Sequence, residues 1–161
     1  MNFILSKCTS FLKWSGKSIC CMALIYQLSA CTTPPKSNNP VMNALYEFPD
    51  FKPNAATKAI VIIADNSCMT CNKELAELMA QYTTRKDILF VVAAHESAID
   101  LSPFTATSRK DMVFDYNHTL TGNQIIQGST VLFLNNKQVD TAIQIEAAAL
   151  AQQLAFLKQR L

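Results

Sequence analysis

The chain has 161 residues, of which 50% are hydrophobic, and its formal net charge is only +2 at pH 7. This length is enough for one domain with a hydrophobic core. Because the chain has neither a strong positive charge nor a basic run interleaved with aromatic residues, its composition argues against a nucleic-acid-binding protein.

Residues 1–30 have the pattern of a signal segment rather than of a folded element. Their charged residues are all basic, namely Lys7, Lys13 and Lys17. Residues 18–28 then form an apolar stretch that is too short to cross a bilayer as a helix. The sequence Leu28-Ser29-Ala30-Cys31 resembles the lipobox of bacterial lipoproteins. That resemblance implies cleavage before Cys31 and attachment of a diacylglycerol to its sulfur through a thioether, with palmitate among the attached chains. A plain cleaved signal and an uncleaved membrane anchor are the alternatives.

Cleavage before Cys31 would simplify the cysteine inventory. It would leave 131 of the 161 residues, with 11 basic and 12 acidic side chains. Of the six cysteines, Cys8, Cys20 and Cys21 would be removed and Cys31 would be acylated, so that only Cys68 and Cys71 would remain as free thiols. Two thiols are too few for a disulfide scaffold or for a four-ligand structural zinc site. The predicted mature part contains no apolar stretch long enough to cross a membrane, so attachment would depend on the lipid alone.

Residues 31–57 are expected to form the lipidated N-terminus, a tether and a segment at the domain edge. Residues 32–40 are polar and rich in proline, which is typical of a flexible tether. Residues 41–51 contain scattered apolar side chains, which predict a short helix or strand packed on the edge of the domain. Pro49 and Pro53 should end that element before the first strand.

Two apolar runs predict the central strands. Residues 59–64 are rich in β-branched side chains and uncharged, as in a buried strand. Residues 71–82 have helical periodicity, with apolar side chains at Leu75, Leu78, Met79 and Tyr82. Residues 87–94 form a second uncharged apolar run, which indicates a central parallel strand.

Shorter elements are predicted after position 94. They are a loop with a helical turn over 95–110, a strand over 112–116, a helix over 120–127 capped by Thr119 or Thr121, a strand over 130–134, a turn over 135–137, an antiparallel edge strand over 137–141 and an amphipathic helix over 145–161. We therefore expect residues 58–161 to form one α/β domain, with a central mixed sheet of four to five strands and helices on both faces. We expect the core to include Phe90, Phe104, Phe114 and Phe133.

The motif Cys68-Met69-Thr70-Cys71 lies where the first predicted strand gives way to the first long helix. At a helix N-terminus, unpaired N–H groups and the helix dipole stabilise a thiolate, which thiol–disulfide exchange requires. Thr70 could also donate a weak hydrogen bond to the Cys68 sulfur. A redox-active pair is the leading hypothesis. A static disulfide or a decayed site, and a metal site, are the alternatives.

The element order and this motif together resemble thioredoxin-fold proteins, especially the membrane-anchored periplasmic thiol–disulfide oxidoreductases. The segment from Asp115 to Leu134 is similar to the family's aspartate, short helix, cis-Pro-Thr and strand. The resemblance implies that Cys68 attacks a substrate disulfide and that Cys71 resolves the mixed disulfide. It implies a monomer without a metal or other cofactor that acts on protein or small-molecule thiols and disulfides. The implied docking residues are Met69, Thr70, Ser129 and Thr130.

Three positions depart from the family pattern. Ser129 replaces the cis-proline, and we predict a trans Gly128–Ser129 bond because a non-proline cis bond costs about 2.5–4 kcal/mol. Ile62 stands where many relatives bury an acid. The spacer Met69-Thr70 contains neither the histidine nor the proline common in relatives.

The expected function is thiol–disulfide exchange on the periplasmic face of a Gram-negative envelope. Thr32 after the lipidated cysteine favours the outer membrane by the sorting rule of this class. The first alternative is a non-catalytic binding or assembly component of an envelope or secretion complex. The second is a copper-handling protein in which His95 or His118 joins the two cysteines.

Overall fold

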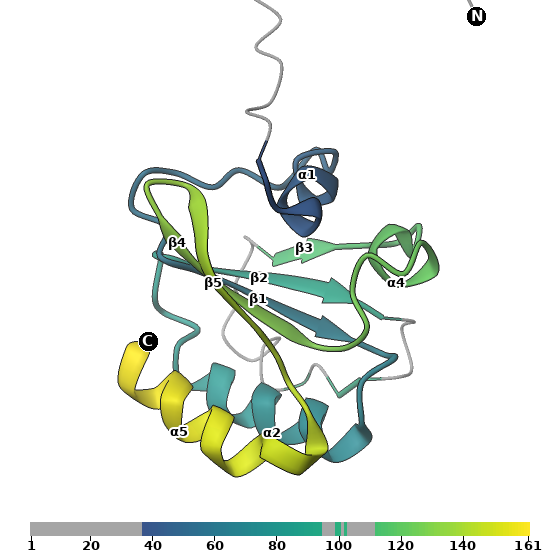
Figure 1. Ribbon diagram of the computed structural model, residues 1–161, viewed down its shortest axis with the longest axis vertical. Coiled ribbons are helices and arrows are strands. Elements are labelled where there is room, and N and C mark those ends of the chain that lie inside the picture. The colour runs from purple at the N-terminus through teal and green to yellow at the C-terminus, as the bar shows by residue number, and fades with distance from the viewer. Residues whose placement is uncertain (1–36, 95–98, 101, 103–111) are drawn as a thin grey trace, which may run out of the picture. The chain divides into compact units, whose positions relative to one another are not determined.

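A five-stranded mixed sheet lies at the centre of the computed structural model, which describes residues 37–94, 99–100, 102 and 112–161 (Figure 1). Its strands are β1 (Ala59–Ala64), β2 (Ile88–Ala93), β3 (Met112–Phe114), β4 (Thr130–Asn135) and β5 (Gln138–Gln144). Their order is β3-β2-β1-β4-β5; β1, β2 and β3 are parallel to one another, whereas β4 is antiparallel to both β1 and β5. The predicted mixed α/β sheet is confirmed, and it is compatible with a thioredoxin-like fold.

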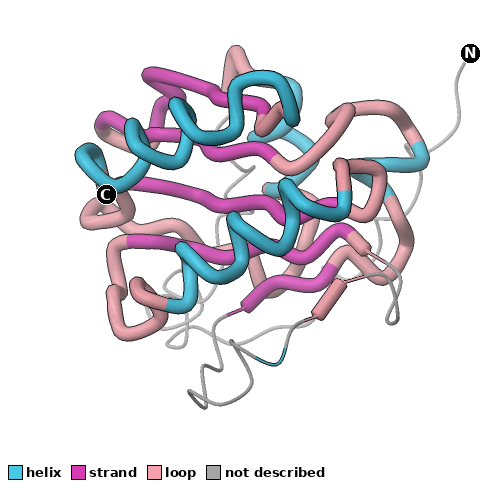
Figure 2. Tube along the Cα trace, turned by 90° about the horizontal axis from the view of Figure 1, so that it is seen from below, coloured by secondary structure: helices cyan, strands magenta, loops and turns pink. Residues whose placement is uncertain are grey.

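Helices cover both faces of the sheet (Figure 1). On one face lie α1 (Pro40–Leu45) and α4 (Thr119–Gly122), and on the other lie α2 (Met69–Ala80) and, after the 3-10 turn η1 (Ala147–Ala149), α5 (Leu150–Arg160). Figure 2 shows α2 and α5 side by side across the strands. None of the helices in the described ranges is both long and apolar enough to cross a membrane.

Alternation along β1 divides the core into two clusters. Ile60, Ile62 and Ala64 pack with α1 and α4, whereas Ala59, Val61 and Ile63 pack with α2 and α5. Successive side chains of a strand point to opposite faces, so a strand that is buried on both faces must be apolar throughout. This requirement explains why the uncharged run of β1 was predictable to the residue.

The segment before β1 belongs to the core more fully than the sequence predicts. It forms a helix, α1, whose Asn39 side chain accepts hydrogen bonds from the backbone N–H groups of Val41 and Met42. Pro40 occupies the first turn, where its missing N–H costs nothing. Met42 and Leu45 are fully buried.

Two predictions about the β3–α4 region are wrong. The short helix ends at Gly122, and its N-cap residue is His118 rather than Thr119 or Thr121. The side chain that bonds its first N–H groups is that of the buried Asp115, whose carboxylate accepts from Thr119 and Leu120, both at 2.8 Å. Phe114 is not a core residue. It is 38% exposed at the end of an edge strand and stacks on Tyr116, with ring centroids 5.6 Å apart.

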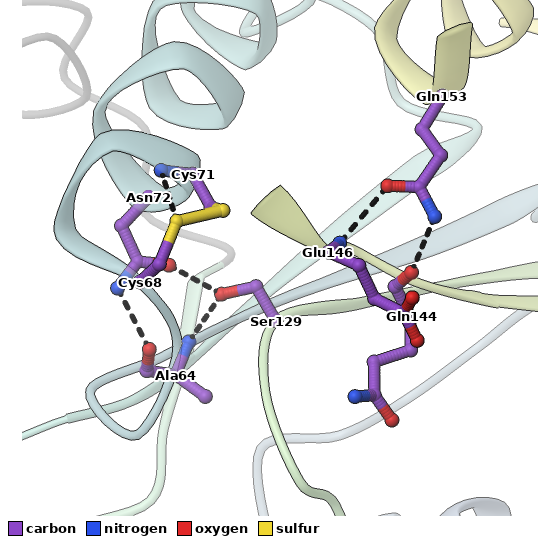
Figure 3. The surroundings of a disulfide bond; sticks show 8 residues. All are labelled: Ala64, Cys68, Cys71, Asn72, Ser129, Gln144, Glu146 and Gln153. Atoms are coloured by element: carbon purple, nitrogen blue, oxygen red, sulfur yellow. Dashed lines mark hydrogen bonds between the residues drawn. A yellow bond between two sulfur atoms is a disulfide. The ribbon is translucent and has the colours of Figure 1, made fainter. Parts of the chain in front are cut away.

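Two of the other predicted core aromatics are confirmed, and the C-terminal helix begins later than predicted. Phe90 and Phe133 are buried, whereas Phe104 lies outside the described residues. The chain continues as β5 to Gln144, and α5 begins only at Leu150. The Gln153 side chain holds this corner, because it accepts from the N–H of Glu146 and donates to the carbonyl of Gln144 (Figure 3).

Candidate functional site

Cys68 and Cys71 form a disulfide at the N-terminus of α2 (Figure 3). Cys68 is the N-cap residue and is exposed, and its sulfur accepts a hydrogen bond from the backbone N–H of Cys71 at 3.0 Å. This backbone group, rather than the expected hydroxyl of Thr70, is the donor to that sulfur. Cys71 lies one helical turn further on, is fully buried, and belongs to the core cluster between the sheet and α2.

This arrangement distinguishes the two sulfurs chemically. Cys68 is an exposed residue at the positive end of the α2 dipole, where a thiolate is stabilised. The Cys71 sulfur is protected from outside reagents and can be reached from Cys68. Met69, which is 87% exposed, and the exposed Thr70 lie between the two cysteines in the first turn. An incoming partner would therefore meet Cys68, Met69 and Thr70 first.

A closed set of three hydrogen bonds lies beside the disulfide; we call it the Ala64–Asn72–Ser129 triangle (Figure 3). The Ser129 hydroxyl accepts from the N–H of Ala64 at 2.9 Å and donates to Oδ1 of Asn72 at 2.6 Å. Nδ2 of Asn72 donates to the carbonyl of Ala64 at 2.8 Å. Ser129 is fully buried and Asn72 is 6% exposed. The triangle joins the end of β1, the first turn of α2 and the residue before β4.

The position of Ser129 explains why a hydroxyl suits this site. The pairing of β1 with β4 ends at Ile62 and Thr130, so the ladder between these two strands does not extend to Ala64. Beyond the end of this ladder, the Ser129 hydroxyl accepts the hydrogen bond from the N–H of Ala64. A buried backbone N–H needs such a partner. The Gly128–Ser129 bond is trans, as predicted, and the residues that the structure describes contain no cis peptide bond.

Asn72 is a site residue that the sequence reasoning missed. It lies three and four positions before Leu75 and Ala76, and it therefore falls on the buried face of α2. A polar side chain on this apolar stripe was the available signal, since a buried amide needs hydrogen-bond partners.

The four predicted docking residues fall into two groups. Met69 and Thr70 are exposed beside Cys68, whereas Ser129 and Thr130 are buried. The Thr130 hydroxyl donates to the carbonyl of Gly128 at 3.0 Å, and the Ser129 hydroxyl belongs to the triangle. The side chains of Ser129 and Thr130 are thus committed to the interior. The carbonyl of Ser129 also accepts from the N–H of Ile145, and Thr130 is paired with both Ile62 and Gln144 in the sheet.

No acid replaces the family's buried carboxylate among the described residues. Ile62 packs in the cluster with α1 and α4, on the face of the sheet opposite Cys71. Asp115 is the one buried acidic side chain in the described ranges, and its two oxygens cap α4. Glu74 and Glu77 are exposed on α2.

The described residues also contain no group of three or more His, Cys, Asp and Glu side chains that could hold a metal ion. His118 is the N-cap residue of α4, and His95 lies outside the described residues, as does the predicted lipidation site Cys31.

No family model, curated protein or solved structure matches the chain. The likeness to a thioredoxin-like fold therefore rests on the strand order and on the place of the cysteine pair at the junction of β1 and α2.

Proposed function

We propose that the protein carries out thiol–disulfide exchange through Cys68 and Cys71. The observation that carries the proposal is the unequal exposure of a bonded cysteine pair at a helix N-terminus. Cys68 is exposed and caps α2, whereas Cys71 is buried one turn later. A purely structural disulfide needs no such asymmetry, but attack followed by resolution does.

The exchange proceeds in two balanced steps. The Cys68 thiolate attacks one sulfur of a substrate disulfide, forms a mixed disulfide and releases the other substrate sulfur as a thiolate, which takes up a proton. The Cys71 thiolate then attacks the Cys68 sulfur, re-forms the Cys68–Cys71 disulfide and releases the second substrate thiol. The substrate gains two electrons and two protons, and the protein loses them. The reverse sequence oxidises a dithiol substrate.

We further propose that the protein is tethered to the outer membrane through an acylated Cys31 and acts in the periplasm on protein or small-molecule thiols and disulfides. The support for this part is the sequence Leu28-Ser29-Ala30-Cys31 after a basic and apolar segment. In an oxidising compartment, removal of residues 1–30 would leave the Cys68–Cys71 pair without competing free thiols.

Alkylation kinetics test the redox proposal. Trypsin should release residues 59–73 as one peptide that contains Cys68 and Cys71 and no other cysteine. In the reduced full protein, we expect Cys68 to be alkylated at least about tenfold faster than Cys71, with a pKa below the value of about 8.5 for a free thiol. Protein denatured in urea is the control, in which both thiols should react alike. Equal, slow labelling of both in the folded protein would contradict the proposal and favour a non-catalytic binding component.

Mass spectrometry of protein isolated from cells tests the tether. We expect the chain to begin at Cys31 and to carry a diacylglycerol and palmitate mass on that residue. Substitution Cys31→Ala should abolish the added mass, because it removes the sulfur that is proposed to carry the diacylglycerol. An unmodified Cys31 or a different N-terminus would disprove the lipoprotein proposal without affecting the redox proposal.

A further inference from the structure

We infer that Asn72 and Ser129 are positioning residues for the cysteine pair: through the Ala64–Asn72–Ser129 triangle they hold the first turn of α2 so that the Cys71 sulfur stays within reach of Cys68 when the disulfide is open. The inference rests on the proposed exchange reaction.

The triangle is well placed for this role because it anchors the residue next to Cys71. Asn72 follows Cys71 directly, and its backbone N–H donates to the carbonyl of Cys68 at 3.0 Å. Its side chain bonds to the end of β1 at 2.8 Å and to Ser129 at 2.6 Å. The first turn of α2 is therefore connected to two strands through one buried amide group.

The anchor acts on the closure of the open, reduced pair. While the disulfide is closed, a covalent bond between Cys68 and Cys71 holds the turn. Once that bond opens, the helix, the packing of Cys71 in the core and the triangle restrain the two sulfurs relative to each other. A restrained thiol attacks its neighbour at a higher effective concentration than a mobile one. The triangle should therefore favour closure of the disulfide in both rate and equilibrium.

The role inferred for Ser129 differs from that of the proline found at the corresponding position in thioredoxin-fold proteins. A proline at 129 has no hydroxyl, so it could neither accept from the N–H of Ala64 nor donate to Asn72. In this chain the residue before β4 supports the cysteine helix from inside the protein. Its side chain is buried, so it does this without facing a substrate.

Equilibration with glutathione tests the inference. The reduced protein and glutathione disulfide react to give the Cys68–Cys71 disulfide and two molecules of glutathione. Differential alkylation of the 59–73 peptide measures the oxidised fraction in the full protein. We expect Ser129→Ala and Asn72→Ala each to lower the equilibrium constant for oxidation by roughly fivefold, about the factor that one net hydrogen bond contributes. Closure of a Cys68–glutathione mixed disulfide by Cys71 should slow in the same variants.

Thr130→Val is the matched control. It removes the hydroxyl of the neighbouring buried residue, whose hydrogen bond goes to Gly128 and not to α2. This variant should leave the glutathione equilibrium within about twofold of the parent, and Ser129→Thr, which retains a hydroxyl, should restore most of the loss. The same shift in Thr130→Val as in Ser129→Ala, or no shift in Ser129→Ala and Asn72→Ala, overturns the inference.

Unfolding in both redox states separates positioning from general stability. The inference requires Ser129→Ala and Asn72→Ala to destabilise the oxidised form more than the reduced form, because the anchor favours closure. Equal destabilisation of the two forms, or failure of both variants to fold in either state, assigns the triangle to general stability and overturns the inference. The glutathione equilibrium is measurable even if Cys68 shows no selective alkylation, so failure of the proposed function and failure of this inference give different results.

Discussion

At the scale of single residues, the buried side chain of Ser129 connects the chain before β4 with the cysteine helix. Its hydroxyl donates one hydrogen bond and accepts another inside the protein. A hydroxyl can do both, whereas the proline of the resembled family can do neither. The Ser129 hydroxyl donates to Asn72, which is an amide on an otherwise apolar helix face. The two residues therefore have to be interpreted as a pair.

The buried Asp115 side chain should contribute to the free energy of unfolding by capping α4. Its two oxygens each accept from a backbone N–H at the start of α4, and its side chain is buried. We expect Asp115→Ala to lower the free energy of unfolding by about 1–2 kcal/mol, as for other lost helix caps, and Asp115→Asn to lower it by less because one acceptor oxygen remains. Urea unfolding measures both. Equal stability of the parent and Asp115→Ala would show that α4 does not depend on this cap.

At the scale of elements, Arg85 connects the approach to β2 with the end of α5. Its guanidinium donates to both carboxylate oxygens of Asp87, at 2.7 and 2.6 Å, and to the carbonyl of Leu161 at 2.6 Å. The hydrogen bonds from Arg85 lower the pKa of Asp87, and partial burial opposes this effect. A carboxyl group with a lowered pKa in the folded state stabilises the protein while it is ionised.

This pair predicts a pH-dependent contribution. Since the pKa is lower in the folded than in the unfolded chain, the stabilisation by Asp87 is present above the unfolded pKa of about 3.9 and is lost as the pH falls through the folded value. We expect Asp87→Asn to cost about 0.5–1 kcal/mol at pH 7, because Arg85 is partly exposed, and progressively less below about pH 4. Glu77→Gln, which removes the exposed pair of Glu77 with Lys73, is the control with little expected effect. A difference that does not change with pH would contradict the assignment.

The sequence predicts some elements more accurately than others. An element is predictable when the residues that stabilise it lie within it, and less so when they lie elsewhere in the chain. The strand Ala59–Ala64 depends on its own apolar residues and was predicted to the residue. The helix α4 depends on Asp115, which lies upstream of its expected caps, and both its cap and its end were predicted wrongly. For the candidate site, the CxxC motif was visible in the sequence, but the triangle joins residues up to 65 positions apart and no local pattern encodes it.

At the scale of the whole molecule, we expect the core to form independently of the disulfide. Both hydrophobic clusters contain buried residues from β1, β2 and β4, and the cysteines close a loop with a sequence separation of only three residues. Closing so short a loop removes little entropy from the unfolded chain, about 2 kcal/mol at most by the chain-entropy relation. A protein that alternates between disulfide and dithiol forms needs this independence.

We therefore expect reduction to leave the fold intact. Reduced protein should keep its far-UV circular dichroism and unfold cooperatively, with a midpoint lowered by no more than roughly 10 °C, because each kcal/mol shifts the midpoint of a domain of this size by a few degrees. The double substitution of Cys68 and Cys71 by serine should behave like the reduced protein. Unfolding on reduction would make the pair a structural link that cannot open during a catalytic cycle, and the binding or assembly role would then become the better account of the domain. Retention of the fold, combined with fast alkylation of Cys68, would leave the exchange reaction as the account that explains both the exposed cysteine and the buried one.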